Sequence, residues 1–100
     1  MSSQHRPKPE DIEILIVEDS PTQAEQLRRL VEAHGYRARV AGNGKTAIEA
    51  MSERTPDLVL SDIEMPEMDG YALCYAIKSD ERWSDTPVVL FTSTSATAPT

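Results

Sequence analysis

Polar side chains that could bind a metal ion or a phosphate follow three separate apolar stretches of this 100-residue chain. The stretches are residues 14–17, 58–60 and 88–91, and the polar residues that follow them are Glu18, Asp19, Asp62 and Thr92. If the stretches are parallel strands, their carboxyl ends meet at one edge of a sheet. Three carboxylates at one place repel one another unless a cation neutralises them. Oxygen donors with room for water and a phosphate suit Mg²⁺, so the pattern predicts a magnesium site; the alternative is a set of solvated acidic loops.

Asp62 is the residue of this set that is best placed to react. A carboxylate beside Mg²⁺ can attack phosphorus and form an acyl phosphate, while the ion draws charge from the transferring oxygens. The Thr92 hydroxyl could then hydrogen-bond the phosphoryl group. The sequence contains no Walker loop, so we expect the phosphate donor not to be a nucleotide bound here. The alternative is that Asp62 only caps a turn at the end of its strand.

The spacing of apolar residues predicts the elements that would position these side chains. Strands at 12–17, 36–40, 58–60 and 88–91 alternate with helical patterns that begin at Ser20, Asn43 and Asp69. At the first helix, Ser20 can cap, Pro21 fits the first turn, and Gln23 would complete a capping box. Arginines alternate with apolar residues in 36–40, which is typical of an edge strand. The alternation of strands and helices predicts an α/β fold with a parallel sheet and helices on both faces.

The composition excludes several classes of partner. The net charge is -7 and the isoelectric point about 4.7, which argues against direct binding of nucleic acid. No apolar run approaches about 18 residues, so we expect no membrane partner. The single cysteine, Cys74, fits a reducing cytosol and a cytoplasmic protein. Residues 1–11 are polar and predict a disordered leader, and residues 93–100 predict a flexible tail.

Four segments together form a specific pattern. They are Ile14-Leu15-Ile16-Val17-Glu18-Asp19-Ser20, Asn43-Gly44, Asp62-Ile63-Glu64-Met65-Pro66-Glu67-Met68-Asp69-Gly70, and Pro87 to Thr92. The chain resembles, on these segments, a response-regulator receiver domain, the phosphoacceptor of two-component signalling. The resemblance covers about residues 12–92 and implies a flavodoxin-like open parallel sheet with strand order 2-1-3-4.

The resemblance also implies roles for individual residues. Asp62 would be the phosphorylated residue, and Thr92 the switch hydroxyl. Glu18, Asp19 and Asp62 would hold Mg²⁺ together with the backbone carbonyl of Glu64. The phosphoryl donor would be a sensor histidine kinase or a phosphotransfer protein, and the domain would act as a conformational signalling switch. Such a domain is not an ordinary enzyme, although it assists its own phosphorylation and dephosphorylation.

The chain departs from the family pattern after strand 88–91. The family continues with a fourth helix, a fifth strand that ends in a phosphate-binding lysine, and a fifth helix. We expect these elements to be missing, so that the receiver domain at 12–92 is incomplete; neither Lys45 nor Lys78 lies at the position of that lysine. We therefore expect slow phosphorylation. Strand 88–91 would be an unprotected apolar edge, which predicts a homodimer through this fourth strand.

Two other functions remain open on these residues. One is a Mg²⁺-dependent phosphatase with an aspartate nucleophile, although its general acid is usually an aspartate where this chain has Glu64. The other is a binding fragment that does not signal, because the phosphate-binding lysine is absent. Breakdown of the acyl phosphate by added substrates would identify the first, and failure to form any aspartyl phosphate would identify the second.

Overall fold

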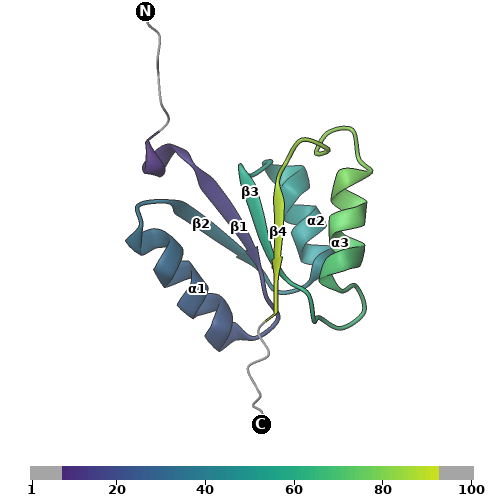
Figure 1. Ribbon diagram of the computed structural model, residues 1–100, viewed down its shortest axis with the longest axis horizontal. Coiled ribbons are helices and arrows are strands. Elements are labelled where there is room, and N and C mark those ends of the chain that lie inside the picture. Colours follow the sequence, from purple (N-terminus) through teal and green to yellow (C-terminus); the bar gives the residue numbers. More distant parts are fainter. Residues whose placement is uncertain (1–7, 93–100) are drawn as a thin grey trace, which may run out of the picture.

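A four-stranded parallel sheet organises the chain, with helices on both of its faces (Figure 1). The computed structural model describes residues 8–92. The elements are η1 (Pro9–Asp11), β1 (Glu13–Val17), α1 (Pro21–Ala33), β2 (Arg37–Ala41), α2 (Gly44–Glu53), β3 (Leu58–Asp62), α3 (Gly70–Lys78) and β4 (Val88–Phe91). The strand order is β2-β1-β3-β4, and α1 lies on the face opposite α2 and α3 (Figure 1). The predicted flavodoxin-like α/β fold is therefore confirmed.

The predicted leader is partly ordered where it meets the sheet. Residues 9–11 form η1, and the Nε atom of Arg37 donates a hydrogen bond of 3.0 Å to the carbonyl of Glu10. This contact ties the short helix to the first residue of β2. Residues 1–7 of the predicted leader and the predicted tail at 93–100 lie outside the described residues. Within residues 8–92, no helix has the length and apolar character needed to cross a membrane.

Each long helix begins at the capping residue that the sequence predicts. The side chains of Ser20, Asn43 and Asp69 accept hydrogen bonds from backbone N–H groups in the first turns of α1, α2 and α3. These side-chain acceptors satisfy N–H groups that have no partner inside the helix. All three helices start at the carboxyl edge of the sheet, so the caps also fix the loops that carry the polar residues of interest.

The core between the sheet and the α2 and α3 helices is apolar and includes one residue from a polar segment. Leu15 and Val17 of β1 belong to this core, and Met51, Leu73 and Ile77 reach it from α2 and α3. Trp83 belongs to this core, although the sequence places it in a polar connection. The turn formed by Asp80 to Thr86 folds the indole inward, and the Arg82 guanidinium covers the ring at 4.2 Å from its centroid.

A buried carboxylate at the amino end of β1 gathers several arginines. The Oε2 atom of Glu13 lies 2.7 Å from Nη2 of Arg54 and 3.1 Å from Nε of Arg39. Arg39 also donates to the carbonyls of Ala50 and Arg54 at the end of α2. Arg39 is therefore held inside, whereas Val40 on the same strand is 44% exposed. The alternation of arginine and apolar residues in β2 therefore does not place every arginine outside and every apolar residue inside, because the buried Glu13 binds the Arg39 guanidinium.

We expect Glu13→Gln to lower the free energy of unfolding at pH 7 by about 1.5 kcal/mol, since a neutral amide leaves Arg39 uncompensated. The hydrogen bond from Arg54 holds the pKa of Glu13 below its usual value. The stabilisation is thus present above the unfolded-state pKa and is lost as the pH falls through the folded-state pKa. Urea denaturation checks this, with the exposed Glu49→Gln as control. Equal losses in both variants would contradict it.

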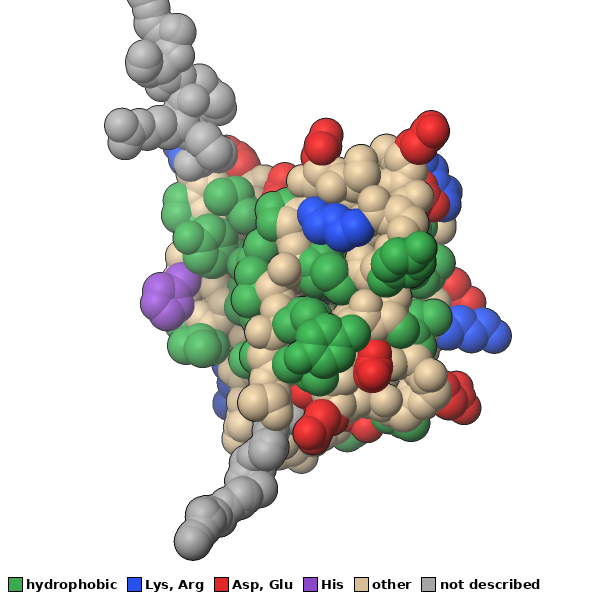
Figure 2. All heavy atoms as spheres, turned by 45° about the vertical axis from the view of Figure 1, so that its right-hand side comes forward, with side chains coloured by type: hydrophobic (Ala, Val, Ile, Leu, Met, Phe, Trp, Pro, Cys, Tyr) green, Lys and Arg blue, Asp and Glu red, His purple; other side chains and the backbone are tan. Residues whose placement is uncertain are grey.

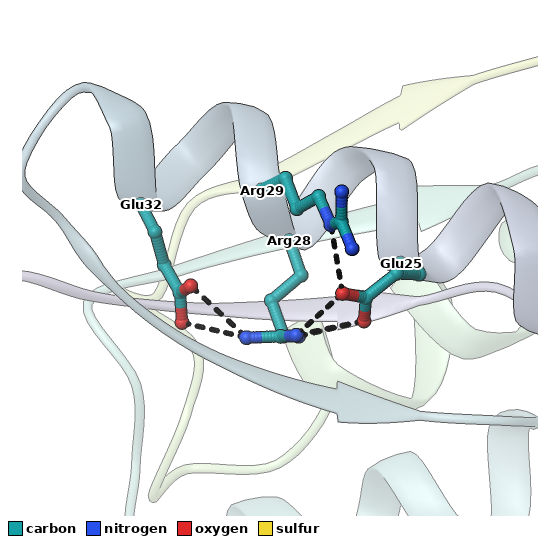
Figure 3. Close-up of polar contacts among 4 residues, drawn as sticks. All are labelled: Glu25, Arg28, Arg29 and Glu32. Carbon is teal, nitrogen blue, oxygen red and sulfur yellow. Dashed lines mark hydrogen bonds and ion pairs between the residues drawn. The ribbon is translucent and has the colours of Figure 1, made fainter.

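The outer surface of α1 carries a network of ion pairs (Figure 3). Arg28 lies between Glu25 and Glu32, at 2.6 Å and 3.0 Å, and Arg29 also contacts Glu25 at 3.1 Å. These pairs have the three- and four-residue spacing that brings side chains together on a helix. The Arg28 guanidinium lowers the pKa of Glu25. The network supports the exposed side of α1, where Leu30 is 56% exposed and apolar packing contributes little.

Candidate metal centre

Glu18, Asp19 and Asp62 converge at the carboxyl edge of the sheet. One carboxylate oxygen from each residue lies within 4.8 Å of the others. The strand register explains this convergence: Val17 of β1 is paired with Ser61 of β3, so the residues that follow them, Glu18 and Asp62, become neighbours. The structure thus brings together the three carboxylates that the sequence singles out, in a group that could hold a metal ion.

Glu18 is the most unusual of the three carboxylates. It is 2% exposed, and its Oε1 atom is buried without a hydrogen-bond partner among the described residues. Its Oε2 atom accepts a hydrogen bond of 3.0 Å from the backbone N–H of Ser20. Burial is the main cause that raises the pKa of Glu18 to about 7, and the neighbouring Asp62 raises it further, against the opposing Ser20 N–H. A bound cation would offset both the cost of burying the ionised Glu18 and its repulsion by Asp62.

Asp62 is the last residue of β3 and is 1% exposed. Its Oδ1 atom accepts a hydrogen bond of 3.1 Å from the backbone N–H of Glu64, so the start of the following loop is fixed on the carboxylate. The loop returns at Gly70, whose N–H donates to the Ile63 carbonyl at 2.9 Å. A Cβ atom at Gly70 would lie 2.5 Å from the carbonyl oxygen of Asp62, so only glycine permits this close approach.

Thr92 and Glu64 lie at the same edge as the carboxylates. Asp62 is paired in register with Phe91 of β4, and Thr92 comes next in the chain. The N–H of Ile63 donates to the Phe91 carbonyl at 2.8 Å, which extends the pairing to the residue before Thr92. Glu64 is exposed and contacts Asp62 through its backbone. The switch role of Thr92 and the ligand role of the Glu64 carbonyl stay predictions.

Ser20 contacts this site in a way that the sequence does not predict. Its hydroxyl caps α1 by accepting from the N–H of Gln23 at 3.3 Å, as predicted. Its own N–H donates to Glu18 rather than to Gln23, so the predicted capping box is not formed as such. The signal that could have indicated this contact is the spacing of two residues between a carboxylate and a helix cap.

Fold and site define the class of this protein as a flavodoxin-like α/β domain with a cluster of three carboxylates at the carboxyl edge of its sheet. The family model of the response regulator receiver domain matches residues 14–99. The chain belongs to this family, and it is a receiver domain of two-component signalling.

Curated relatives show the same family in proteins of different lengths. The chain is 43% identical over 83 residues to "Histidine kinase P4" of Formosa agariphila, covering 83% of the chain and 6% of the relative. It is 38% identical to "DNA-binding response regulator MtrA" of Mycolicibacterium smegmatis, covering 80% and 34%. It is 36% identical to "Protein PilH" of Pseudomonas aeruginosa, covering 80% and 66%. The chain thus spans between about a twentieth and about two thirds of the length of these relatives.

Solved structures agree with the fold. The signal receiver domain of a histidine kinase from Syntrophus aciditrophicus is 50% identical, with a TM-score of 0.77, covering 84% of this chain and 64% of that one. The chemotaxis protein CheY4 of Vibrio cholerae is 24% identical with a TM-score of 0.78, covering 85% and 71%, and supports the fold alone.

Proposed function

We propose that this receiver domain accepts a phosphoryl group on Asp62 from a sensor histidine kinase or a phosphotransfer protein, in the cytoplasm and with Mg²⁺. Glu18, Asp19 and Asp62, with the backbone carbonyl of Glu64, would hold the ion. The observation that carries the proposal is the group of three carboxylates whose oxygens lie within 4.8 Å of one another. A relative named as a histidine kinase is consistent with a kinase as partner.

The residues present fit a hard divalent cation. The set contains only oxygen donors, and Mg²⁺ is usually held by one or two carboxylates, with water and phosphate oxygens completing its shell. The buried Oε1 atom of Glu18, which has no hydrogen-bond partner among the described residues, supports the binding of a cation here, because a carboxylate oxygen without a donor is costly to bury. Asp19 is exposed, so the site is open to water and to a phosphate on one side.

The chemistry follows from the position of Asp62. Its carboxylate oxygen would attack the phosphorus of a phosphohistidine, the phosphorus–nitrogen bond would break, and the imidazole nitrogen would keep the electron pair. The product is an acyl phosphate on Asp62. When bound, Mg²⁺ would neutralise charge on the phosphoryl oxygens. The Thr92 hydroxyl would then donate a hydrogen bond to the new group and couple it to the end of β4, which shifts a conformational equilibrium.

We expect Mg²⁺ to shift the amide resonances of Ser20 and Glu64, whose N–H groups contact the carboxylates. Asp19→Asn should weaken the apparent affinity by about tenfold or more, or about 1.4 kcal/mol, because the site loses one charge. Amide shifts suit this titration better than Trp83 fluorescence, since Trp83 lies between α3 and β4 in the apolar core. Asp85→Asn, an exposed position in that same connection, is the matched control. If Asp19→Asn responds to Mg²⁺ as the wild type does, Asp19 is not a ligand of the metal ion.

We further propose that two copies of this 100-residue chain associate through β4. Within residues 8–92, β3 is the only strand paired with β4, and Val89 is 46% exposed. Figure 2 shows hydrophobic side chains gathered on the face that carries α3 and β4. An apolar edge strand readily pairs with another chain. Sedimentation at micromolar and millimolar protein should show a concentration-dependent dimer that Val89→Lys weakens; a compact monomer at both concentrations would contradict this proposal.

A further inference from the structure

A small hollow lies between the start of α2 and the loop that joins β3 to α3, the loop that follows Asp62. Its volume is about 260 Å³, and its lining residues are Asn43, Gly44, Lys45, Pro66, Glu67 and Met68. Pockets that hold drug-sized molecules usually measure about 300–1,000 Å³. The hollow is therefore small for a metabolite and suits a single large side chain.

Gly44 lets Met68 take its place in the wall of this hollow. A Cβ atom at Gly44 would lie 2.5 Å from Sδ and 2.8 Å from Cγ of Met68, so the Met68 side chain rests directly on the backbone of the first residue of α2. The φ angle of Gly44 is not in the left-handed region, so the glycine serves this contact and not an unusual backbone. A larger residue at position 44 would displace Met68, which forms one wall of the hollow.

A strained turn holds the wall that Pro66 and Met68 form. The N–H of Met68 donates to the Pro66 carbonyl at 2.8 Å, which closes a turn of three residues around Glu67. Glu67 has a φ angle of 67°, and a γ-turn with positive φ is rare and strained. Such strain persists where the surrounding structure imposes it, and it is concentrated at functional sites. The turn fixes Pro66 and Met68 relative to each other at the surface.

One wall of the hollow belongs to the loop that follows Asp62, the residue that a phosphodonor protein would have to reach. The loop that lines it begins at Glu64, whose N–H is bonded to the Asp62 carboxylate. The apolar wall residues are Pro66 and Met68, and the polar residues at its sides are Asn43, Lys45 and Glu67. Apolar centres with polar rims are typical of the pockets that receive an anchoring side chain in protein interfaces.

We propose that this hollow is a specificity pocket for one large apolar or aromatic side chain of the protein that donates the phosphoryl group to Asp62. The inference rests on the proposed function of Asp62. A protein donor must cover the carboxyl edge of the sheet to bring its phosphohistidine to Asp62, and its surface then lies over the hollow. A small phosphodonor such as acetyl phosphate makes no such contact, so the pocket affects only transfer from a protein.

Two glycine substitutions distinguish the effect of the hollow on donor recognition from the reactivity of Asp62 itself. Gly44→Ala changes the shape of the hollow by displacing Met68, whereas a Cβ atom at Gly42 meets nothing within 4 Å. Phosphorylation is measured with acetyl phosphate and with the histidine kinase that transfers fastest to the wild-type chain in a side-by-side comparison of kinases. We expect the ratio of the kinase rate to the acetyl phosphate rate to fall at least fivefold in Gly44→Ala. In Gly42→Ala the ratio should stay at the wild-type value.

The outcomes distinguish this inference from the proposed function. If the wild-type chain is labelled but the ratio is the same in all three proteins, the pocket has no role in recognition. If neither donor labels the wild-type chain, the proposed function of Asp62 is wrong and the inference fails with it. Met68→Ala, which removes the wall instead of displacing it, provides a second variant should Gly44→Ala fold poorly, and its ratio should also fall.

Direct binding provides a test that needs no kinase. N-acetyl-phenylalaninamide is titrated against protein labelled at the methionine methyl groups, with N-acetyl-alaninamide as the small counterpart. We expect a saturable shift of the Met68 methyl resonance with the aromatic probe alone, and none at Met51, which is 1% exposed in the core. The shift should be lost in Gly44→Ala. Equal shifts with both probes, or no shift at Met68, would contradict the proposal that the hollow binds a large apolar or aromatic side chain.

Discussion

Acetyl phosphate is expected to label the wild-type chain on a single residue, Asp62, and Asp62→Asn should lose this labelling down to background. The expectation follows from the position of Asp62 at the end of β3, within 4.8 Å of the other two carboxylates. An amide at this position cannot form an acyl phosphate, so the substitution removes the reaction instead of slowing it. Intact-mass spectrometry in the presence of Mg²⁺ measures the extent of labelling, and peptide mapping identifies the residue.

The matched control for this experiment is Asp85→Asn, which makes the same chemical change at an exposed position between α3 and β4. It should be labelled as the wild type is. Label on Glu18 or Asp19, or label retained in Asp62→Asn, would show that another carboxylate is the nucleophile. Chelation of Mg²⁺ should suppress labelling in the wild type, because the phosphoryl oxygens then lose their cation. If the extent of labelling is the same with and without the chelator, Asp62 reacts without Mg²⁺ and the proposed role of the metal ion is wrong.

The order of elements could be predicted because its signals are local. Ser20, Asn43 and Asp69 cap the three long helices as the sequence indicates, and a cap depends only on residues within one turn. Continuous apolar runs likewise predict strands buried on both faces. The convergence of Glu18 with Asp62 also follows from sequence, once the sheet is parallel, because the ends of neighbouring strands share an edge.

The features that the sequence does not predict depend on contacts between distant segments. Trp83 is buried although its neighbours are polar, because the turn after α3 folds it onto the core. Arg39 lies inside because it meets the buried Glu13, 26 positions earlier in the chain. The left-handed conformation of Glu67 has no signal in its residue type, since positive φ favours glycine or asparagine. Such contacts depend on the assembled fold.

Glu18 provides the second large effect, a pH dependence of stability in the metal-free protein. In the unfolded chain its carboxyl ionises near the ordinary value of 4.5, whereas burial, and then the neighbouring carboxylates, raise the pKa in the folded chain to about 7. Between these values the folded state binds more protons than the unfolded state. The contribution of Glu18 therefore lowers stability as the pH rises from about 4.5 to about 7, and it is constant above that range.

Glu18→Gln should remove this dependence, because glutamine does not titrate. At pH 8 with a chelator, we expect the variant to be more stable than the wild type by about 2 kcal/mol, below the limit of about 3.4 kcal/mol that a rise of the Glu18 pKa from 4.5 to about 7 allows. At pH 5 the difference should fall to less than half of this, since Glu18 is then protonated in the folded wild type and the unfolded chain is only partly ionised. Urea denaturation at pH 5, 6, 7 and 8 measures the difference, and the exposed Glu49→Gln is the control.

Saturating Mg²⁺ should reverse this order at pH 8. The ion would bind the ionised Glu18 in the folded wild type and add stability by mass action, whereas Glu18→Gln offers a weaker ligand and gains less. The two proteins differ only at position 18, so the difference between them isolates Glu18. Parallel pH profiles for wild type and Glu18→Gln would show that this buried carboxylate is ionised without cost. The repulsion that motivates a cation at this edge would then be absent.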